Sequence, residues 1–487
     1  MSKNLNQLYP APLWNIFANI CAIPHPSKHE DKILVWLKEW AKENKIDYAQ
    51  DETGNILFRK PATPGMENRV PVVLQAHIDM VPQANSDVKH DFLTDPIRPV
   101  VGDDGWVRAS GTTLGADNGI GVAAAMAVLI DDKAQHGPIE VLITVDEETG
   151  MTGAFGLKSG FVNAEILINL DSEEEGELFV GCAGGLDATF EFDYKTEPAK
   201  EGMVGYQFAV TGLKGGHSGM DIVLGRANAN KVMARFLKKA TEQFGVRIST
   251  INGGSLRNAI PREAFVLLAV PKDQVAPFEK YFNQFAECIT AEFSGTEPQM
   301  SLQLEKQETP KTLITSDWQQ KIINLVFAIP NGVLRMSDSM PGLVETSTNL
   351  ATVKIADGKG TIGNLMRSSV ESAKEAVGQK MKAIAELAGV QCSLTGGYSG
   401  WKPNMDSPIL KTMKEVYLKK YGVEPKISAI HAGLECGLFS QVYPHWDMIS
   451  FGPTIQFPHS PDEKVEIASV GKFYDYLVET LKHIPQK

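Results

Sequence analysis

The sequence has few cysteines and a deficit of positive charge. Its 487 residues contain five cysteines, none spaced as Cys-x-x-Cys: Cys21, Cys182, Cys288, Cys392 and Cys436. This pattern argues against a disulfide framework or a thiolate zinc site, and we expect reduced, mostly buried thiols. Lys and Arg number 47 against 59 Asp and Glu, which gives a net charge of −12. A net-negative surface gains nothing from phosphate polymers or anionic lipids, so neither nucleic acid nor a membrane is expected as a partner.

Long apolar runs are also missing. The longest, residues 120–130, is far shorter than the ~20 residues of a membrane-spanning helix. The first residues, Met-Ser-Lys-Asn-Leu-Asn, contain no apolar stretch of the kind found in signal peptides. We therefore expect a cytoplasmic protein. The apolar content of 43% is ordinary, which excludes disorder, and the length is roughly three times that of a domain of about 150 residues.

The first half of the chain alternates helix-like and strand-like segments, which is typical of an α/β layer. Short runs rich in Val, Ile and Leu at 70–76, 139–145 and 166–170 predict buried central strands. The Ala-rich segment 118–130 is apolar all round and predicts an internal helix. The sequence therefore predicts an α/β fold with a mixed, largely parallel sheet flanked by helices.

The pattern changes near residue 186. Alternating strands and amphipathic helices follow, for example at 227–244 and 275–293, and a similar round occupies 318–396. Two units of similar order indicate an inserted α+β lid domain that is internally duplicated. The α/β pattern then returns. We predict a catalytic domain of two parts, 1–185 and 398–487, around a lid of residues 186–397.

Four segments place metal-binding side chains soon after a predicted strand or at the start of the Ala-rich helix, and a fifth lies near the C-terminus. They are His77-Ile78-Asp79, Gly115-Ala116-Asp117-Asn118-Gly119, Asp146-Glu147-Glu148-Thr149-Gly150, Asn169-Leu170-Asp171-Ser172 and Pro458-His459-Ser460-Pro461-Asp462-Glu463. Ligands bind at the carboxyl ends of the strands in open α/β sheets, so we expect the segments to converge on one crevice.

Each segment taken alone has an ordinary alternative. His77 and Asp79 face the same side of an extended chain, so Asp79 can orient a metal-bound imidazole, but a core histidine beside a turn aspartate fits equally. Asp117 can cap the helix or bridge two cations through its two oxygens. Asp171 can be a turn residue. The run Glu173-Glu174-Glu175 reads better as a solvated loop than as an amine-binding site.

Glu147 and Glu148 follow a strand that should be buried, where adjacent acids are costly unless cations accompany them. A solvated loop is the alternative. Consecutive residues at a strand end point in opposite directions, so one acid can bind metal while the other serves as general base.

Charge helps to choose the cofactor. Three carboxylates and two neutral imidazoles form the candidate ligand set: Asp117, Glu148, Asp171, His77 and His459. Two divalent ions with one bridging hydroxide would neutralise this set, whereas one ion would leave it negative. Mixed imidazole and carboxylate ligands favour zinc, with manganese or cobalt as alternatives. Such a pair lowers the pKa of the bridging water and polarises a carbonyl, and Glu147 would move the proton to the leaving amine.

These segments resemble the co-catalytic zinc aminoacylase/carnosinase metallopeptidases. The matching stretches span essentially the whole chain: Gln75-Ala76-His77-Ile78-Asp79, Leu114-Gly115-Ala116-Asp117-Asn118-Gly119, Asp146-Glu147-Glu148-Thr149-Gly150, Asp171-Ser172-Glu173-Glu174 and Pro458-His459-Ser460-Pro461. The resemblance implies a dinuclear metallopeptidase with two Zn²⁺ per chain. It implies a bridging Asp117, with His77 and Asp171 on one ion and Glu148 and His459 on the other. Asp79 would orient a ligand, and Glu147 would be the base.

The same resemblance implies hydrolysis of unblocked dipeptides by a hydroxide that bridges the two metals, with a preference for Xaa-His, carnosine-like substrates. In the lid, Gly215-Gly216-His217-Ser218-Gly219 resembles a segment that delivers a histidine to the scissile carbonyl. Asn258 and Arg367 resemble positions that bind the substrate carboxylate. A Gly-rich turn and a surface arginine are the ordinary alternatives. His217 would act either within its own chain or across a homodimer formed through the lid, and both possibilities stay open. The roles of His431 and Glu435 stay unassigned.

Other activities remain as alternatives. The same site would serve a tripeptide aminopeptidase or an N-acyl amino-acid deacylase. A non-catalytic peptide- or metal-binding protein would have a damaged ligand set or lack the base, and the sequence shows neither. A nucleic-acid module would need a basic face, which the net charge of −12 does not suggest.

Overall fold

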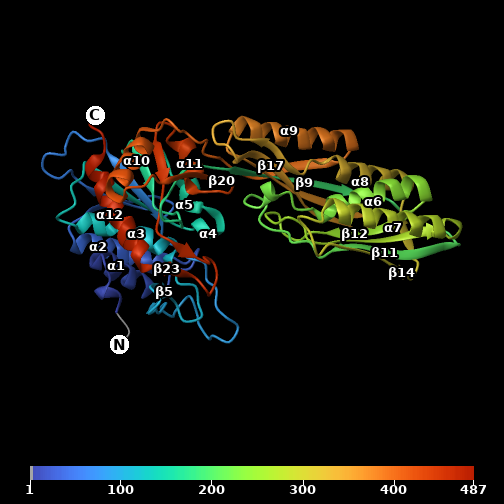
Figure 1. The fold of residues 1–487 in the computed structure, drawn as a ribbon, viewed down its shortest axis with the longest axis horizontal. Coiled ribbons are helices and arrows are strands. Elements are labelled where there is room, and N and C mark those ends of the chain that lie inside the picture. Colours follow the sequence, from blue (N-terminus) through green and yellow to red (C-terminus); the bar gives the residue numbers. More distant parts are fainter. Residues whose placement is uncertain (1–3) are drawn as a thin grey trace. The chain divides into compact units, whose positions relative to one another are not determined.

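The computed structural model describes residues 4–487. Residues 1–3, which belong to the N-terminal stretch and to the first predicted catalytic segment, lie outside the described residues. The chain forms two compact units (Figure 1). The first unit comprises Met1–Gly181, Pro403–Ala429 and Leu434–Lys487, and the second comprises Cys182–Lys402 and Ile430–Gly433. The predicted limits of the catalytic domain, 1–185 and 398–487, and of the lid, 186–397, stay a prediction.

The first unit contains a sheet of eight strands in the order β1-β2-β6-β3-β7-β21-β8-β20. Their bounds are β1 (Asp47–Gln50), β2 (Ile56–Lys60), β3 (Val72–His77), β6 (Ile139–Thr144), β7 (Ile166–Asn169), β8 (Glu177–Cys182), β20 (Lys426–Ile430) and β21 (Asp447–Ser450). The central strands β6, β3, β7 and β21 are parallel, while β2 joins β6 and β8 joins β21 in antiparallel pairs. The prediction of a mixed, largely parallel sheet is confirmed.

The core of the first unit lies around the central strands. Every residue of β3, β6 and β7 is buried, which explains why Val, Ile and Leu predominate in them. Helix α3 (Ala116–Ile130) packs against β3 and β6, and α1 (Ala11–Cys21) and α12 (Ile467–His483) pack against α3. Residues 118–129 of α3 are all buried, so the predicted internal helix is confirmed.

The remaining elements of the first unit are short or peripheral. The helices are η1 (Leu5–Gln7), α2 (Asp31–Glu43), α4 (Glu147–Gly150), α5 (Thr152–Gly156), α10 (Pro408–Tyr421) and α11 (Glu435–Val442). A second sheet has the order β22-β23-β5-β4, formed by β22 (Ile455–Gln456), β23 (Lys464–Glu466), β5 (Trp106–Arg108) and β4 (Val100–Val101). The antiparallel pair β22 and β23 encloses the loop 457–463, which carries the last candidate ligand.

The second unit is built on an antiparallel sheet in the order β14-β11-β13-β12-β17-β18-β9-β19, with β16 paired to β17. The strands are β9 (Gly184–Asp193), β11 (Met203–Thr211), β12 (Arg247–Gly253), β13 (Ala264–Pro271), β14 (Ser301–Gln307), β16 (Gly332–Met336), β17 (Val344–Ala356), β18 (Lys359–Ser368) and β19 (Gln391–Tyr398). Four helices pack on the sheet and on one another (Figure 1): α6 (Ala229–Phe244), α7 (Val275–Glu292), α8 (Ser316–Ala328) and α9 (Glu371–Ala388). The small elements are β10 (Thr196–Pro198), β15 (Thr312–Ile314), η2 (Ile222–Leu224) and η3 (Lys272–Gln274).

The two halves of this unit share one order of elements. One set of elements, β11-α6-β12-β13-α7-β14, has the spatial order β14-β11-β13-β12. The other set is split by it in the chain, because β9 precedes β11 while α8, β17, β18, α9 and β19 follow β14, and its strands have the order β19-β9-β18-β17. In both, the fourth strand lies beside the first, followed by the third and second. A duplication predicts this order, and the duplication itself stays a prediction.

The described residues bear on two expectations, one about membrane-spanning helices and one about the burial of the cysteines. No helix among them combines the length and the apolarity needed to cross a membrane. Cys21, Cys182 and Cys436 are buried, Cys392 is half-buried and Cys288 is exposed. Most of the thiols are therefore buried, as expected.

Candidate metal centre

The parallel strands deliver candidate ligands to one edge of the sheet of the first unit. His77 is the last residue of β3, and Asp171 follows β7 by two residues. Glu147 and Glu148 follow β6, and His77 pairs in register with Thr144 at the end of that strand. Because these strands run in the same direction, their carboxyl ends meet, as the sequence predicted.

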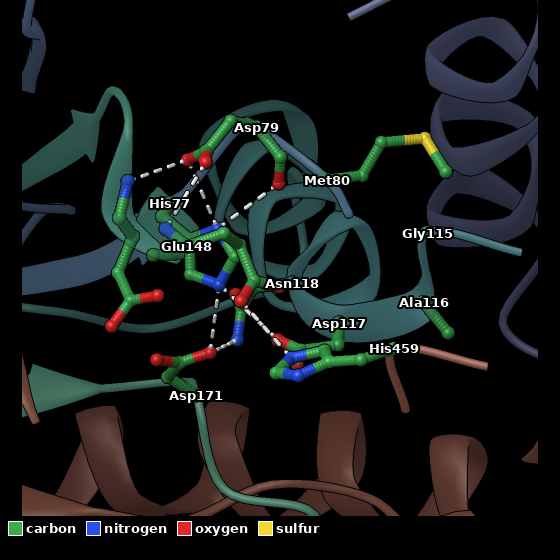
Figure 2. A network of polar contacts seen from close by, with 12 residues as sticks. His77, Asp79, Met80, Gly115, Ala116, Asp117, Asn118, Glu148, Asp171 and His459 are labelled. Atoms are coloured by element: carbon green, nitrogen blue, oxygen red, sulfur yellow. Dashed lines mark hydrogen bonds and ion pairs between the residues drawn. The ribbon is translucent and has the colours of Figure 1, made fainter. Parts of the chain in front are cut away.

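Asp117 contacts both imidazoles of the cluster (Figure 2). Its Oδ1 is 3.1 Å from His77 Nε2, and its Oδ2 is 3.3 Å from His459 Nε2. Asp171 Oδ1 lies 3.3 Å from His77 Nε2, and Glu148 Oε2 lies 3.0 Å from His459 Nε2. The side chains therefore form two triads, each with an imidazole and two carboxylates, that share Asp117.

The donor set fits two divalent cations. Within each triad one ligand atom per residue lies within 4.8 Å of the others, and the measured imidazole-to-carboxylate separations are 3.0–3.3 Å. Ligand atoms about 2.0–2.2 Å from a tetrahedral zinc ion are themselves about 3.3–3.6 Å apart, so the spacing is close to that of such a site. Glu148 Oε1 is buried and has no hydrogen-bond partner among the described residues. An unpaired buried carboxylate oxygen is costly, and a cation would relieve that cost.

The electrostatics of the cluster point the same way. Hydrogen bonds to Asp117 and Glu148 raise the pKa of His459 to about 11. Burial alone would lower the pKa of His77, but Asp171, Asp117 and Asp79 raise it well above its ordinary value. Burial raises the pKa of Asp171 to about 6. The imidazoles are thus the positive partners of these buried acids, a role that divalent cations fill more strongly.

Asp79 connects His77 to the start of α4. Its Oδ1 lies 3.3 Å from His77 Nδ1 and accepts the backbone N–H of Glu147 at 2.9 Å. Its Oδ2 accepts the N–H of Glu148 at 3.2 Å and the hydroxyl of Ser27 at 2.8 Å. One carboxylate therefore orients an imidazole and fixes the backbone of two acids, which is the arrangement expected around a metal ligand.

Glu147 stands beside the cluster. One of its oxygens lies within 4.8 Å of ligand atoms of His77 and Glu148, and burial raises the pKa of its carboxyl well above the ordinary value. The prediction that Glu147 and Glu148 point in opposite directions along a strand is wrong. Strand β6 ends at Thr144 and both acids lie in α4, where successive side chains are about 100° apart.

Sequence reasoning gave no role to several buried polar residues around the cluster. Asn118 Nδ2 donates to Leu170 O at 3.0 Å and also to Asp171 Oδ1. Glu435 is buried, accepts from Gln75 Nε2 at 2.6 Å and from the Thr144 hydroxyl at 2.8 Å, and burial raises its pKa to about 8. The position of Asn118 next to Asp117 in the sequence could have indicated that it belongs to the site. Glu435 gave no such signal, because the residues that it contacts are far away in the chain.

Two further acids have environments that the sequence did not reveal. Burial, together with Asp117 and Asp171, raises the pKa of Glu173 to about 8. Glu173 is half-buried, so the prediction of a solvated loop does not hold fully for it. Glu463 is 2% exposed and accepts hydrogen bonds from the backbone around Asp117.

The lid candidates lie in the second unit. Arg367 on β18 is only 5% exposed, so the alternative of a surface arginine is wrong. Its Nη1 donates to the Tyr398 hydroxyl at 2.9 Å, and its Nη2 lies 3.4 Å from His217 Nε2. The carbonyl of Asn258 accepts the N–H of Ser218 at 2.8 Å. The structure therefore brings His217 and Arg367 together and ties Asn258 to the same segment through the backbone.

Residues 73–483 match the model of the Peptidase family M20/M25/M40. The chain belongs to this family. It is therefore a metallopeptidase, a hydrolase, as the ligand segments predicted. Within the family it is 49% identical over 485 residues to the cytosol non-specific dipeptidase of Escherichia coli (strain K12), an alignment that covers 100% of both chains.

Solved structures extend this relationship. The crystal structure of aminoacylhistidine dipeptidase from Vibrio alginolyticus matches with a TM-score of 0.95 and 49% identity, covering 100% of this chain and 99% of that one. A tripeptidase from Staphylococcus aureus matches with a TM-score of 0.55 and 17% identity over 98% of this chain and 99% of its own, which shows a shared fold alone. The resemblance to the metallopeptidase family inferred from the motifs is confirmed.

Proposed function

We propose that this chain hydrolyses unblocked dipeptides at a centre of two divalent metal ions, with Glu147 as general base. The observation that carries the proposal is the position of Asp117, whose two oxygens each lie within 3.3 Å of a different imidazole. The two full-length relatives, at 49% identity, both have names that describe dipeptidases.

The ligands divide between the two ions. His77 and Asp171 would hold one ion, Glu148 and His459 would hold the other, and Asp117 would offer an oxygen to each. Divalent ions held by these residues would lower the pKa of a bound water and polarise the scissile carbonyl. Glu147 accepts a proton from the attacking water and passes it to the nitrogen of the leaving amine when the C–N bond breaks. Burial raises the pKa of the Glu147 carboxyl, which makes its carboxylate a stronger proton acceptor.

The second unit supplies substrate-binding groups in this proposal. The Arg367 guanidinium offers paired N–H donors for a substrate carboxylate. Burial and the charge of Arg367 lower the pKa of His217, which favours the neutral imidazole, and a neutral imidazole can donate its one N–H to a carbonyl oxygen that gains negative charge. Asn258 contributes to carboxylate binding, and His217 acts either within its own chain or across a homodimer formed through the lid.

Several finer assignments belong to the same proposal. The ions are Zn²⁺, with Co²⁺ or Mn²⁺ as substitutes, because imidazole and carboxylate ligands are mixed. The preferred substrates are Xaa-His dipeptides. The name of the Vibrio relative supports this preference, whereas the Escherichia coli relative is called non-specific. We place the enzyme in the cytoplasm, in line with the word cytosol in the name of that relative.

A substrate panel tests the activity. We expect the zinc-loaded enzyme to hydrolyse β-Ala-His and other free dipeptides, and to leave tripeptides and N-acyl amino acids largely intact. Faster turnover of tripeptides or acyl amino acids would favour the alternative activities and contradict the proposal. Dipeptides with and without a C-terminal histidine in the same panel measure the proposed preference.

The base assignment has its own test. Glu147→Gln keeps the size of the side chain but removes its proton acceptor, so kcat should fall by about 10²- to 10⁴-fold while metal content stays unchanged. The control is Glu43→Gln, which alters an exposed acid at the end of α2 and should behave as wild type. A fully metal-loaded Glu147→Gln enzyme with wild-type kcat would eliminate Glu147 as the base.

A further inference from the structure

One buried carboxylate near the centre is neither a candidate ligand nor the base. Glu463 lies in the loop 457–463 and is 2% exposed. Its Oε2 accepts the backbone N–H groups of Leu114 at 2.7 Å and Gly115 at 3.0 Å. Its Oε1 accepts those of Ala116 at 2.8 Å and Asp117 at 3.2 Å. Four consecutive backbone N–H groups therefore converge on this one side chain.

The backbone around Asp117 is shaped for this contact. Gly115 has φ of 71°, in the left-handed region that favours glycine. This conformation curls residues 114–117 so that their N–H groups face one anion, as in the anion-binding nests of other loops. Because both oxygens of Glu463 are used twice, the contact fixes the backbone that carries Asp117.

The same side chain belongs to the loop of another candidate ligand. His459 is four residues before Glu463, its side chain is 54% exposed, and its φ is 58°. Its ring nitrogen Nε2 contacts Asp117 Oδ2 at 3.3 Å and Glu148 Oε2 at 3.0 Å. Neither Asp117 nor His459 is on a strand of the large sheet. Glu463 connects the two loops that carry them.

We propose that Glu463 is a positioning residue that holds the loops of Asp117 and His459 in register for metal binding. Loss of Glu463 would then disturb two of the three ligands of one ion, Asp117 and His459. For the other ion, bound by His77, Asp117 and Asp171, only one ligand would be disturbed. Affinity for the first of these ions should therefore fall more. The inference rests on the proposed two-metal centre.

The direct test is Glu463→Gln. One acceptor oxygen becomes an NH₂ group, which faces two backbone N–H donors and leaves both without an acceptor. The matched control is Glu140→Gln. Glu140 is 7% exposed, and its Oε2 accepts the N–H groups of Asn163 at 2.7 Å and Ala164 at 2.9 Å. It lies near the start of β6, at the opposite end of the strand from the candidate ligands.

Zn²⁺ binding to each metal-free protein is measured by competition with a chromophoric chelator, alongside thermal unfolding. We expect wild type and Glu140→Gln to bind two ions with the same pair of affinities, although Glu140→Gln unfolds at a lower temperature. Glu463→Gln should bind one ion within about threefold of wild type and the other at least tenfold more weakly. Equal weakening of both ions, or none, would overturn the inference.

A second variant covers the case in which Glu463→Gln does not fold. Glu463→Asp keeps the charge but shortens the side chain by one methylene. It should widen the gap between the affinities for the two Zn²⁺ ions less than Glu463→Gln does. An unchanged gap in a folded Glu463→Asp protein would also refute the positioning role. If wild type itself binds fewer than two ions, the two-metal proposal fails instead, so the two failures are distinguishable.

Discussion

Gly121 offers a sharp test of how closely α3 must approach the candidate ligand Asp171. A Cβ atom at this position would lie 2.1 Å from Asn118 Oδ1 and 2.6 Å from the backbone oxygen of Leu170, whereas ordinary contacts are 3.4–4 Å. Asn118 also donates to Leu170 O and to Asp171. The substitution Gly121→Ala would therefore push on the groups that position one predicted ligand.

Two opposing effects determine how much Gly121→Ala changes the free energy of unfolding. Alanine favours a helix interior over glycine by about 1 kcal/mol. Overpacking of a close contact costs about 1–3 kcal/mol, and the hydrogen bond from Asn118 to Leu170 contributes about 1 kcal/mol. The Leu170 oxygen is a backbone atom next to Asp171, so it cannot move aside as a flexible side chain would. We expect a net destabilisation of about 1–3 kcal/mol together with weaker metal binding at Asp171.

The assay is urea unfolding of the metal-free proteins, followed by Zn²⁺ competition on the folded variants. Gly295→Ala is the control, because a Cβ there meets no atom within 4 Å, and its free energy of unfolding should stay within about 0.5 kcal/mol of wild type. A Gly121→Ala protein that is more stable than wild type would show that helix propensity outweighs the contact. Unchanged Zn²⁺ affinity would refute the link between Gly121 and the ligand.

Two further predictions concern the cofactor and the substrate. Removal of the metal with a chelator should abolish dipeptide hydrolysis and lower the unfolding temperature, because a ligand at one hundred times its Kd adds about 2.7 kcal/mol of stability. Melting curves with and without Zn²⁺ measure the loss of stability, and identical curves would contradict the prediction. Arg367→Lys keeps the charge but loses the paired donors, so KM for free dipeptides should rise by about tenfold or more while KM for C-terminally amidated dipeptides stays the same. Equal KM changes for both substrate sets would remove Arg367 from carboxylate binding.

The sequence could predict the candidate ligands at strand ends because a physical rule places them. The runs of β3, β6 and β7 are mostly apolar, and every residue in them is buried, because both faces of such strands are covered. Parallel strands then bring their carboxyl ends together. Acids and a histidine that follow such runs therefore meet without any knowledge of the intervening loops.

Other features depend on pairings that periodicity does not encode. Strand β14 is mostly half-buried or exposed, and β12 has a bulge between Ile248 and Thr250, so neither has a clear apolar alternation. The contacts of Glu463 with residues 114–117 and of Glu435 with Gln75 join segments more than 340 residues apart. The burial of these acids follows from the assembled fold, and their local sequences resemble those of ordinary surface acids.

The candidate ligands differ in what holds them, and this difference has a consequence for metal binding. His77 and Asp171 are at or next to the ends of paired strands, so the hydrogen-bonded ladder of the sheet fixes their backbones. Asp117 precedes the regular part of α3, where Asp117 and Asn118 have non-helical dihedral angles, and His459 lies in the loop 457–463. Side-chain contacts join these loops: the four hydrogen bonds of Glu463 and the contact of His459 with Asp117. In the proposed two-metal centre, one ion would depend mainly on the sheet and the other on a pair of loops, so changes in those loops should lower the affinity for the second ion more than for the first without altering any ligand.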